Sequence, residues 1–492
     1  MIAHLPVLQV IVPLMAAPIC LLLKRAQLVW LFSLITSGLA FLISILLLQQ
    51  VMATGVISYE LGGWQAPWGI EYRIDKLNAF LLLIISAIST IVLFAAQTSI
   101  EKEIPKSKHT LFYVLYLLSL TGMLGIVATG DAFNVFVFLE ISSLSAYALI
   151  ALGKDRRALW AAYQYLIMGT IGATFILIGI GLMYQMTGTL NMVDLSQRLP
   201  EVAQTRTVFA AFGFVIVGVC LKLALFPLHL WLPNSYAYAP SIVTAFFAAT
   251  ATKVAVYLLI RFTFSVFGVS FSFTTIPLQT LFMALGLVGI FVASTAAIYQ
   301  KNIKLLFAYS SIAQIGYMIV GFSMATVTGL TATLLHMFNH ALMKSAIFLA
   351  LAAIVYRLGN VQLSSFHGLG RQMPLTMAAI VIGGLSLIGV PLTVGFVSKW
   401  YLLMAIIEQG WWPVAVLILL GSLLAVIYVW RIVEVAYFKE PLANQTPVKE
   451  APLFFLIPIW ILIIANIYFG IDTRLSVQVA QSAAMTLFGV TP

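Results

Sequence analysis

Charged residues are scarce in this 492-residue sequence. Only 8% of the residues are charged and 62% are hydrophobic, whereas soluble globular proteins carry about 25% charged residues. This composition excludes an ordinary water-soluble fold. Because one transmembrane helix takes ~20 apolar residues, the chain has room for many spans joined by short connections, and we expect its function to lie within the bilayer.

Cysteine and the usual cofactor motifs are also scarce. Cys20 and Cys220 lie in apolar runs without CxxC or CxxH spacing, so a disulfide framework, a zinc site and an iron–sulfur site are not supported. The sequence has no P-loop, dinucleotide fingerprint or haem spacing. We therefore expect no cofactor, no metal and no catalysis by the chain itself. The net charge of +10 is not gathered into a long basic cluster, so it indicates membrane topology and not a nucleic-acid partner.

Apolar runs separated by polar segments predict an all-α polytopic membrane protein of about fourteen helices. The first run lacks a basic leader and a cleavage site, and we interpret it as a retained helix and not as a signal peptide. The runs, numbered here as spans 1 to 14, start near Leu5, Gln27, Leu77, Leu111, Ala132, Trp160, Thr207, Ile242, Pro277, Ile303, Val327, Leu375, Trp412 and Pro452.

Basic residues divide unevenly between the two sides of this stack. Connections that follow odd-numbered spans hold fifteen of the 25 lysines and arginines, and the even-numbered connections with the C-terminal tail hold six. Lys and Arg close to membrane ends favour the cytoplasmic side. We therefore expect both termini on the outer face and the connections after odd-numbered spans in the cytoplasm.

Two spans are interrupted by proline, span 7 at residues 226–233 and span 12 at residues 389–391. Broken backbone at membrane depth is tolerated where it is buried in protein or lines a watery cavity. The separation of five spans predicts two inverted five-helix repeats, and two ordinary proline kinks are the alternative. The single membrane domain, residues 1–492, would then comprise spans 1 to 3 (1–110), a first repeat (111–264), a second repeat (276–437), and span 14 with the tail (451–492).

Five ionisable residues fall inside spans, where each costs ~2.5–3.5 kcal/mol on insertion scales and usually marks an ion path. Burial lowers the proton affinity of an ammonium group and a nearby carboxylate raises it, so a lysine tuned in this way can load and release a proton. The alternative for each residue is a charge neutralised by a partner or by backbone carbonyls for folding alone. The five are Glu140, Lys222, Lys253, Lys344 and Lys399.

Histidines accompany these charges. His336, His340 and Lys344 follow one another at helical spacing and share one face. The histidines lack an HExxH motif and a third ligand, so a proton relay is favoured over a zinc site. His229 lies in the break of span 7, where it would serve either as a relay or as a cap for freed backbone groups.

Four segments of the sequence form a recognisable set. The longest is the run from Leu221 to Pro233 followed by Ala239-Pro240-Ser241. The others are Phe138-Leu139-Glu140, Lys304 with the run from Ala308 to Tyr317, and Asn339-His340-Ala341 with Lys344 and Phe348-Leu349. Together they resemble the antiporter-like subunits shared by respiratory complex I and the Mrp multisubunit cation/proton antiporters.

The resemblance implies a hydrated polar axis through the membrane midplane of fourteen helices in two inverted repeats. It implies that Glu140 modulates the proton carrier Lys222 and that Lys253 bridges the two halves. His336 and His340 would then connect to the terminal residue, Lys399.

Within this family the sequence is most similar to the D-type component of Mrp antiporters. Asn234 follows Trp-Leu-Pro, where complex I relatives usually have aspartate, and the chain ends soon after span 14. We therefore expect a subunit of a sodium/proton antiporter with other membrane subunits as partners. The alternatives are a proton-pumping subunit of a complex I, NDH-type or hydrogenase redox complex, and a scaffold without transport of its own.

Overall fold

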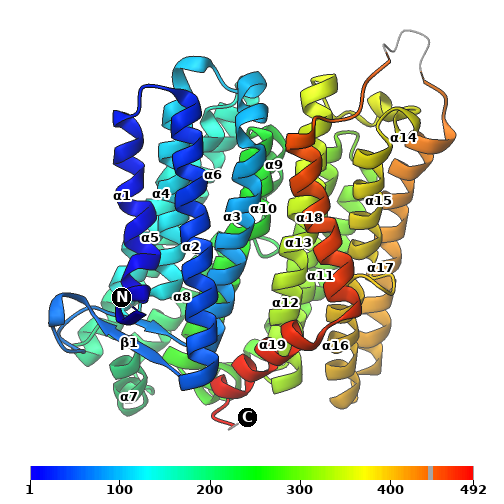
Figure 1. Cartoon of the computed structure of the whole chain (residues 1–492). Helices are drawn as coiled ribbons and strands as arrows, with labels where there is room; N and C mark the ends of the chain where they lie inside the picture. The colour runs from blue at the N-terminus through cyan, green and yellow to red at the C-terminus, as the bar shows by residue number, and fades with distance from the viewer. Residues whose placement is uncertain (1, 442–446, 491–492) are drawn as a thin grey trace.

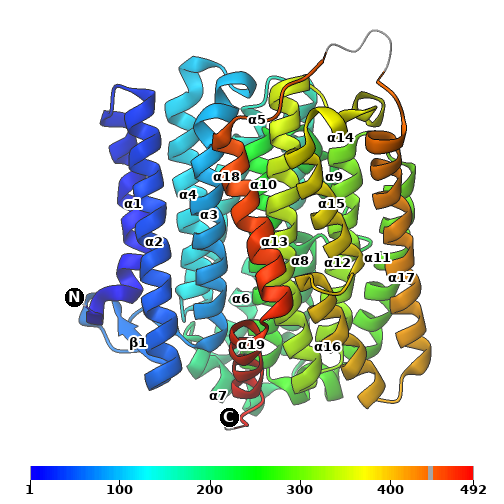
Figure 2. The ribbon, with the colours of Figure 1, turned by 45° about the vertical axis from the view of Figure 1, so that its right-hand side comes forward.

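The structure is a computed structural model and describes residues 2–441 and 447–490. These residues form one bundle of roughly parallel helices (Figures 1 and 2). Thirteen helices within them are long and apolar enough to cross a membrane, and the broken pair α15 and α16 supplies the fourteenth span. The predicted number of spans is therefore confirmed.

The spans follow the predicted order along the chain. Spans 1 to 3 are α1 (Leu5–Leu22), α2 (Ala26–Thr54) and α3 (Lys76–Glu103). The first five-helix set is α4 (His109–Ala128), α5 (Ala132–Ala151), α6 (Arg156–Thr187), α8 (Arg206–Leu223) with α9 (Trp231–Tyr238), and α10 (Ser241–Ile260). The second set is α11 (Leu278–Tyr299), α12 (Ile303–Ser323), α13 (Val327–Leu358), α15 (Pro374–Ile388) with α16 (Val394–Glu408), and α17 (Trp412–Val433), and α18 (Leu453–Ile471) is the last span.

Both sets have their broken helix in the fourth position, as inverted repeats require. The two sets meet at the centre of the bundle, where α10 packs against α13 and α3 lies beside both. These central helices are buried along most of their length, whereas α1, α2 and α17 expose apolar faces. Polar and charged side chains within membrane spans usually face the interior of the bundle and not the lipid. The buried central helices are therefore where a polar axis can lie.

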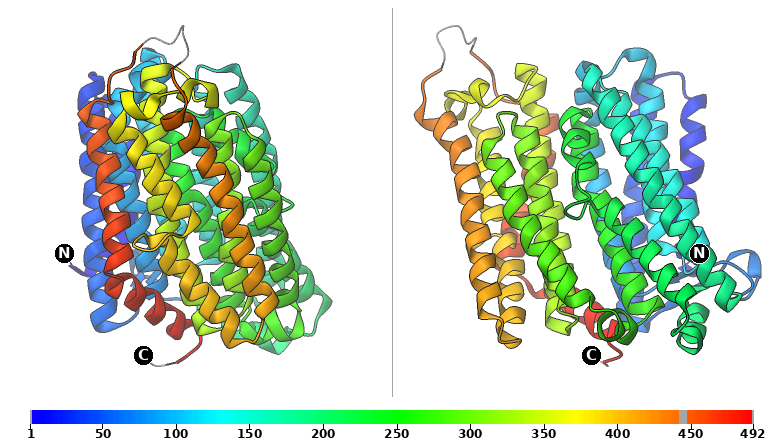
Figure 3. Two further views of the ribbon diagram at one scale, coloured as in Figure 1. Left: turned by 90° about the vertical axis from the view of Figure 1, so that its right-hand side faces the viewer. Right: turned by 180° about the vertical axis from the view of Figure 1, so that it is seen from behind.

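The two ends of the bundle differ. The N-terminal residues, the C-terminal helix α19 (Arg474–Leu487), α7 (Met192–Val202) and the hairpin of β1 (Ile57–Glu60) and β2 (Glu71–Ile74) lie at one end, which we call the terminal face (Figures 1 and 3). The opposite end carries the connections that follow odd-numbered spans, and we call it the basic face. The connections over residues 51–76 and 187–206 contain this hairpin and the helix α7.

The hairpin is antiparallel, with Ile57 opposite Ile74 and Glu60 opposite Glu71. The remaining short segments are the helix α14 (Leu369–Gln372), 3-10 turns at Ile2–His4, Leu61–Gly63, Lys106–Lys108 and Leu363–Phe366, and π-helical turns at Arg261–Val266, Ser270–Thr275 and Glu434–Phe438.

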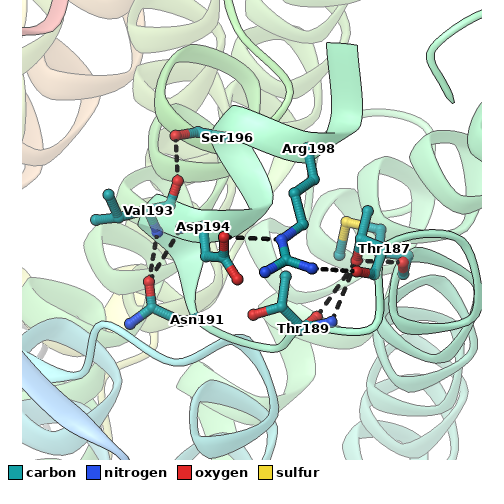
Figure 4. Close-up of polar contacts among 8 residues, drawn as sticks. Thr187, Thr189, Asn191, Val193, Asp194, Ser196 and Arg198 are labelled. Atoms are coloured by element: carbon teal, nitrogen blue, oxygen red, sulfur yellow. Dashed lines mark hydrogen bonds and ion pairs between the residues drawn. The ribbon is translucent and has the colours of Figure 1, made fainter. Parts of the chain in front are cut away.

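Helix α7 is fixed to the end of α6 by polar contacts (Figure 4). The side-chain oxygen of Asn191 accepts hydrogen bonds from the backbone of Val193 and Asp194 and so caps the helix. Arg198 pairs with Asp194 at 2.8 Å and donates to the carbonyl of Thr187, the last residue of α6. The same contacts orient α7 across the terminal face.

Candidate polar axis

The break in span 7 places Lys222 in the last turn of α8. Ala224 adopts a left-handed conformation with φ of 57°, and the chain is not α-helical again until Trp231. The indole of Trp231 donates to the carbonyl of Leu221 at 2.9 Å, which satisfies one of the acceptors that the break frees. The partial negative charge of the α8 C-terminus favours a cation at this position.

The ammonium of Lys222 faces hydroxyl groups of α5. It donates to Ser143 Oγ at 2.8 Å and to the Tyr147 hydroxyl at 3.4 Å. Glu140 lies one turn before Ser143 on the same helix, close enough to interact electrostatically with Lys222. Within the described residues Glu140 forms no ion pair and its Oε1 is buried without a hydrogen-bond partner. The structure therefore brings the two groups together without direct contact.

A cavity of about 40 Å³ lies beside Lys222 and reaches α10, with Ser142, Ala251 and Val254 in its lining. This space is large enough for a water molecule. Lys253 is the next charge along the axis, fully buried in the middle of α10. Its ammonium donates to the carbonyl of Ala248 at 2.5 Å, and the Thr252 hydroxyl lies at 3.4 Å.

Helix α13 carries the central relay candidates. His336 is held on both sides, with Nδ1 2.8 Å from Ser398 Oγ and Nε2 2.9 Å from Gln314 Oε1. The His340 ring is parallel to it at 6.1 Å, fully buried, and neither ring nitrogen has a partner in the described residues. Lys253 lies within electrostatic range of both rings, so the two repeats are connected here.

Lys344 extends the same face of α13. It is fully buried, donates to the carbonyl of Phe307 at 2.8 Å and contacts Ser310 Oγ. Like Lys253, it lies within electrostatic range of His340. The three residues expected on one face of span 11 are therefore near one another in space.

The break in span 12 is built around Lys399. This side chain reaches from α16 back to the end of α15 and donates to the carbonyls of Leu387 and Ile388, both at 2.9 Å, and to Ser422 Oγ at 2.9 Å. These are free C-terminal carbonyls, which favour a cation. Lys399 also lies 4.5 Å from the centre of the Tyr317 ring. Each repeat thus holds a buried lysine at the C-terminal end of a broken half-helix.

His229 lies in the break of span 7. It is buried, its ring stacks on Phe226 at 5.3 Å, and its Nδ1 has no partner in the described residues. The ring also hydrogen-bonds to the backbone of Pro227, as a cap for the freed backbone groups would. The free Nδ1 leaves room for a relay role in which a water or an incoming proton meets this atom.

Two basic residues expected in connections also prove to be buried. Lys304, in the first turn of α12, donates to Ser241 Oγ at 2.8 Å, and Glu103 accepts from the same serine. Arg261 is held in a mostly buried ion pair with Asp75, with the two side chains 11% and 14% exposed. Neither residue is therefore a simple topological charge. The spacing of Lys304, Ser311 and Gln314 along one apolar span was the available signal for a polar face on α12.

No group of three or more His, Cys, Asp and Glu side chains within residues 2–441 and 447–490 is arranged to hold a metal ion. The candidate residues are instead ammonium and imidazole groups with one carboxylate, Glu140, and such a set offers a metal few ligands. Ionisable groups buried within membrane spans are typical of ion and proton paths.

Comparisons with known proteins agree with this interpretation. Residues 129–425 match the family described as NADH:quinone oxidoreductase/Mrp antiporter, TM, and the chain belongs to that family. It is 40% identical over 489 residues to an NADH-quinone oxidoreductase subunit N from Desulforudis audaxviator, covering 96% of each chain. It is 28% identical to the D-type component of a Na(+)/H(+) antiporter from Bacillus subtilis, over 98% of this chain and 96% of the relative.

The fold agrees as well. A chain of the membrane-bound sulfane sulfur reductase, an archaeal respiratory membrane complex, superposes with a TM-score of 0.89 and 32% identity, over 99% of this chain and 98% of that one. The protein is therefore an antiporter-like membrane subunit of the family that includes Mrp and complex I proteins, and the resemblance seen in the sequence is confirmed.

Proposed function

We propose that the chain moves protons along a buried axis that runs from Glu140 and Lys222 through Lys253 and the α13 residues His336, His340 and Lys344 to Lys399, with His229 as a relay at the first break. The observation that carries this proposal is the chemistry of the lysine partners. All four axis lysines donate to carbonyl or hydroxyl oxygens and none forms an ion pair in the described residues.

Neutral partners matter because they stabilise an ammonium without fixing its charge. An opposite charge at short range would hold the proton, whereas an amine that loses its proton can keep hydrogen bonds to hydroxyl groups. A series of such lysines and histidines at membrane depth would pass a proton from one group to the next. The same oxygen contacts would also neutralise buried charges in a scaffold, so transport by an assembled lysine variant is the measurement that separates the two functions.

We infer that the chain works with other membrane subunits, because the similar proteins are named as subunits of larger assemblies. Two driving forces are open to such a subunit. Similarity to the Na(+)/H(+) antiporter relative favours exchange of protons for a monovalent cation, most simply Na⁺. Similarity at 40% identity to the quinone oxidoreductase relative, and to the sulfane sulfur reductase chain, favours redox-driven pumping along the same axis.

We also propose the orientation and the division of the chain. The excess of basic residues on the basic face would place that face in the bacterial cytoplasm and both termini outside. Residues 111–264 and 276–437 would be the two inverted repeats, with 1–110 and 451–492 as flanking helices.

The test measures proton movement in proteoliposomes that contain the whole complex with Lys222→Ala in this subunit. We expect proton movement to be lost although the complex assembles. Lys106→Ala, which removes an exposed lysine from the basic face, is the matched control and should transport normally. Near-normal proton movement by the assembled Lys222→Ala complex would refute the axis. The driving force is then assigned by supplying either a sodium gradient or the electron donor of the complex.

A further inference from the structure

A second cavity opens on the terminal face and ends close to the axis. It has a volume of about 320 Å³ and lies between the start of α3, the α4–α5 connection, α7, the end of α10 and α19. Asp75, Asn78, Tyr257 and Arg261 are among its lining residues. None of these residues belongs to the proposed axis.

The depth of this cavity is set by α10. Lys253, Tyr257 and Arg261 follow one another at intervals of four residues, so neighbouring members of the series lie on the same side of the helix and ~6 Å apart along its axis. Tyr257 lines the cavity, and Lys253 is one turn deeper and fully buried. The cavity therefore brings the terminal face to within about one helical turn of the central lysine.

The end of the cavity is closed by hydrogen bonds. The Tyr257 hydroxyl donates to the carbonyl of Val127 at 3.1 Å and accepts from Arg261 Nε at 3.2 Å. The Asn78 amide donates to the same Val127 carbonyl at 3.1 Å. The Tyr257 proton is thus committed to a backbone carbonyl and is not directed toward Lys253.

A fixed positive charge lies in front of this closure. Arg261 pairs with Asp75 at 2.8 Å, and their side chains are 11% and 14% exposed, which makes this the most buried ion pair of residues 2–441 and 447–490. Arg261 also opens the π-helical turn Arg261–Val266, and π-helical turns are frequent at functional sites. A guanidinium group keeps its charge at all relevant pH values, so it repels protons and cations at a constriction.

We propose that Arg261, held in place by Asp75 and Tyr257, is an electrostatic barrier that prevents protons and cations in the terminal-face cavity from reaching Lys253. The proposal rests on the proposed function, because a conducting axis loses its gradient if ions enter it at the middle. Asp75 supplies the anchor and Arg261 supplies the repulsion.

The size of the effect follows from the geometry. Arg261 is eight residues from Lys253, or ~12 Å along the helix. An isolated unit charge at that distance, with an effective dielectric constant of about 20, changes the rate of crossing by roughly tenfold. The negative charge of Asp75 offsets part of this repulsion, so roughly tenfold is the upper bound. We therefore expect Arg261→Gln to raise the passive proton permeability of the assembled complex by up to that factor.

The experiment measures passive proton flux into proteoliposomes that contain the native complex, with a potassium diffusion potential and no exchangeable sodium or electron donor. Arg261→Lys keeps the positive charge, so its passive proton flux should stay at the level of the unmodified complex. Asp75→Asn removes the ion pair but keeps the oxygen that caps α3. Its passive proton flux should be lower than that of Arg261→Gln. Arg198→Gln breaks an exposed Arg–Asp pair of the same length on the same face, and as the matched control (Figure 4) it should not leak.

Three results would overturn the barrier. The first is an equal passive proton leak in Asp75→Asn and Arg261→Gln, which would indicate loss of packing. The second is an Arg261→Gln complex with no added leak and normal transport. The third is Arg261→Gln transport that is slowed without a leak, which would make the cavity a conducting port. Subunit composition by size-exclusion chromatography confirms assembly in each case. Because leak is measured separately from the Lys222→Ala transport test, failure of the barrier and failure of the axis are distinguishable.

Discussion

Single residues show how this membrane protein accommodates buried charge. The ammonium groups of Lys222, Lys253, Lys344 and Lys399 each have at least one carbonyl or hydroxyl oxygen at hydrogen-bonding distance. These contacts offset part of the cost of removing a charge from water. Neither ring nitrogen of His340 has such a partner in the described residues, so hydrogen bonds to this ring must come from water.

Glu140 and Lys222 should act as a unit although they form no ion pair. Lys222→Ala removes the carrier, and Glu140→Ala leaves the lysine without its nearby carboxylate, so each should abolish or strongly reduce transport. Glu140→Asp keeps the charge with a shorter reach and should retain partial activity with a shifted pH profile. Because coupled residues are non-additive, the double replacement should be no worse than Lys222→Ala in assembly and in proton flux. A double variant that assembles clearly less well would argue against coupling.

The charged members of the axis could be recognised in the sequence because an ionisable residue within an apolar span is costly and therefore rare. Their partners could not. Ser143, Ser310 and Ser422 look like many other serines in membrane helices, which usually bond their own backbone. The burial of Lys304 and Arg261 was not predicted for a different reason: each lies near a span end, where solvated and buried positions have the same sequence pattern.

At the scale of elements, the two breaks determine where the lysines lie. Proline at 227 and 391 predicted both interruptions. The sequence did not predict that Ala224 and Leu392 would take left-handed conformations, with φ of 57° and 70°, because non-glycine residues seldom do so. Nor did it predict that Lys399 would reach across its break to the carbonyls of the preceding half-helix, since this depends on the angle between the two halves.

Gly389 is the residue on which the second break depends. Its φ is 94°, and an added Cβ would lie 2.9 Å from Lys399 Cδ. We expect Gly389→Ala to cost about 1–2 kcal/mol in backbone strain and also to displace Lys399 from its carbonyl ligands. Thermal unfolding of the purified complex measures the first effect, and proton flux measures the second.

Gly410→Ala is the control for this prediction. Gly410 also has a positive φ, 71°, but no atom lies within 4 Å of the added Cβ, so this variant should lose similar stability and keep transport. Equal flux in the two alanine variants would show that the position of Lys399 does not matter.

The whole molecule has two chemically different faces, and this difference predicts its orientation. Both termini lie on the terminal face, and the connections rich in lysine and arginine lie on the other. If the positive-inside rule holds, single cysteines at Lys108 and Gln300 should react with an impermeant thiol reagent only after the cytoplasmic side is exposed. The native Cys20 and Cys220 are buried and provide a low background. Labelling of either site in sealed cells would reverse the proposed orientation.

The axis extends from one side of the bundle to the other, and this extent predicts that the isolated chain does not transport by itself. At its far end Lys399 binds Ser422 of α17, and α17 exposes Leu419, Leu420 and Leu423 on its other side. In a protein whose relatives are named as subunits, such an apolar wall faces lipid or a neighbouring chain. On the proposed axis, charge that reaches Lys399 would be separated by one helix from whatever adjoins the bundle.

We therefore expect the pure chain in liposomes to show no sodium-driven or potential-driven proton exchange, and the native complex to show exchange that requires Lys222. A folded preparation is established first by helical circular dichroism and a monodisperse elution profile, so that inactivity cannot be attributed to unfolding. Adding back the remaining subunits should restore the flux. Robust exchange by the folded chain alone would mean that the axis needs no neighbour, and the driving step would then have to be sought among its own residues.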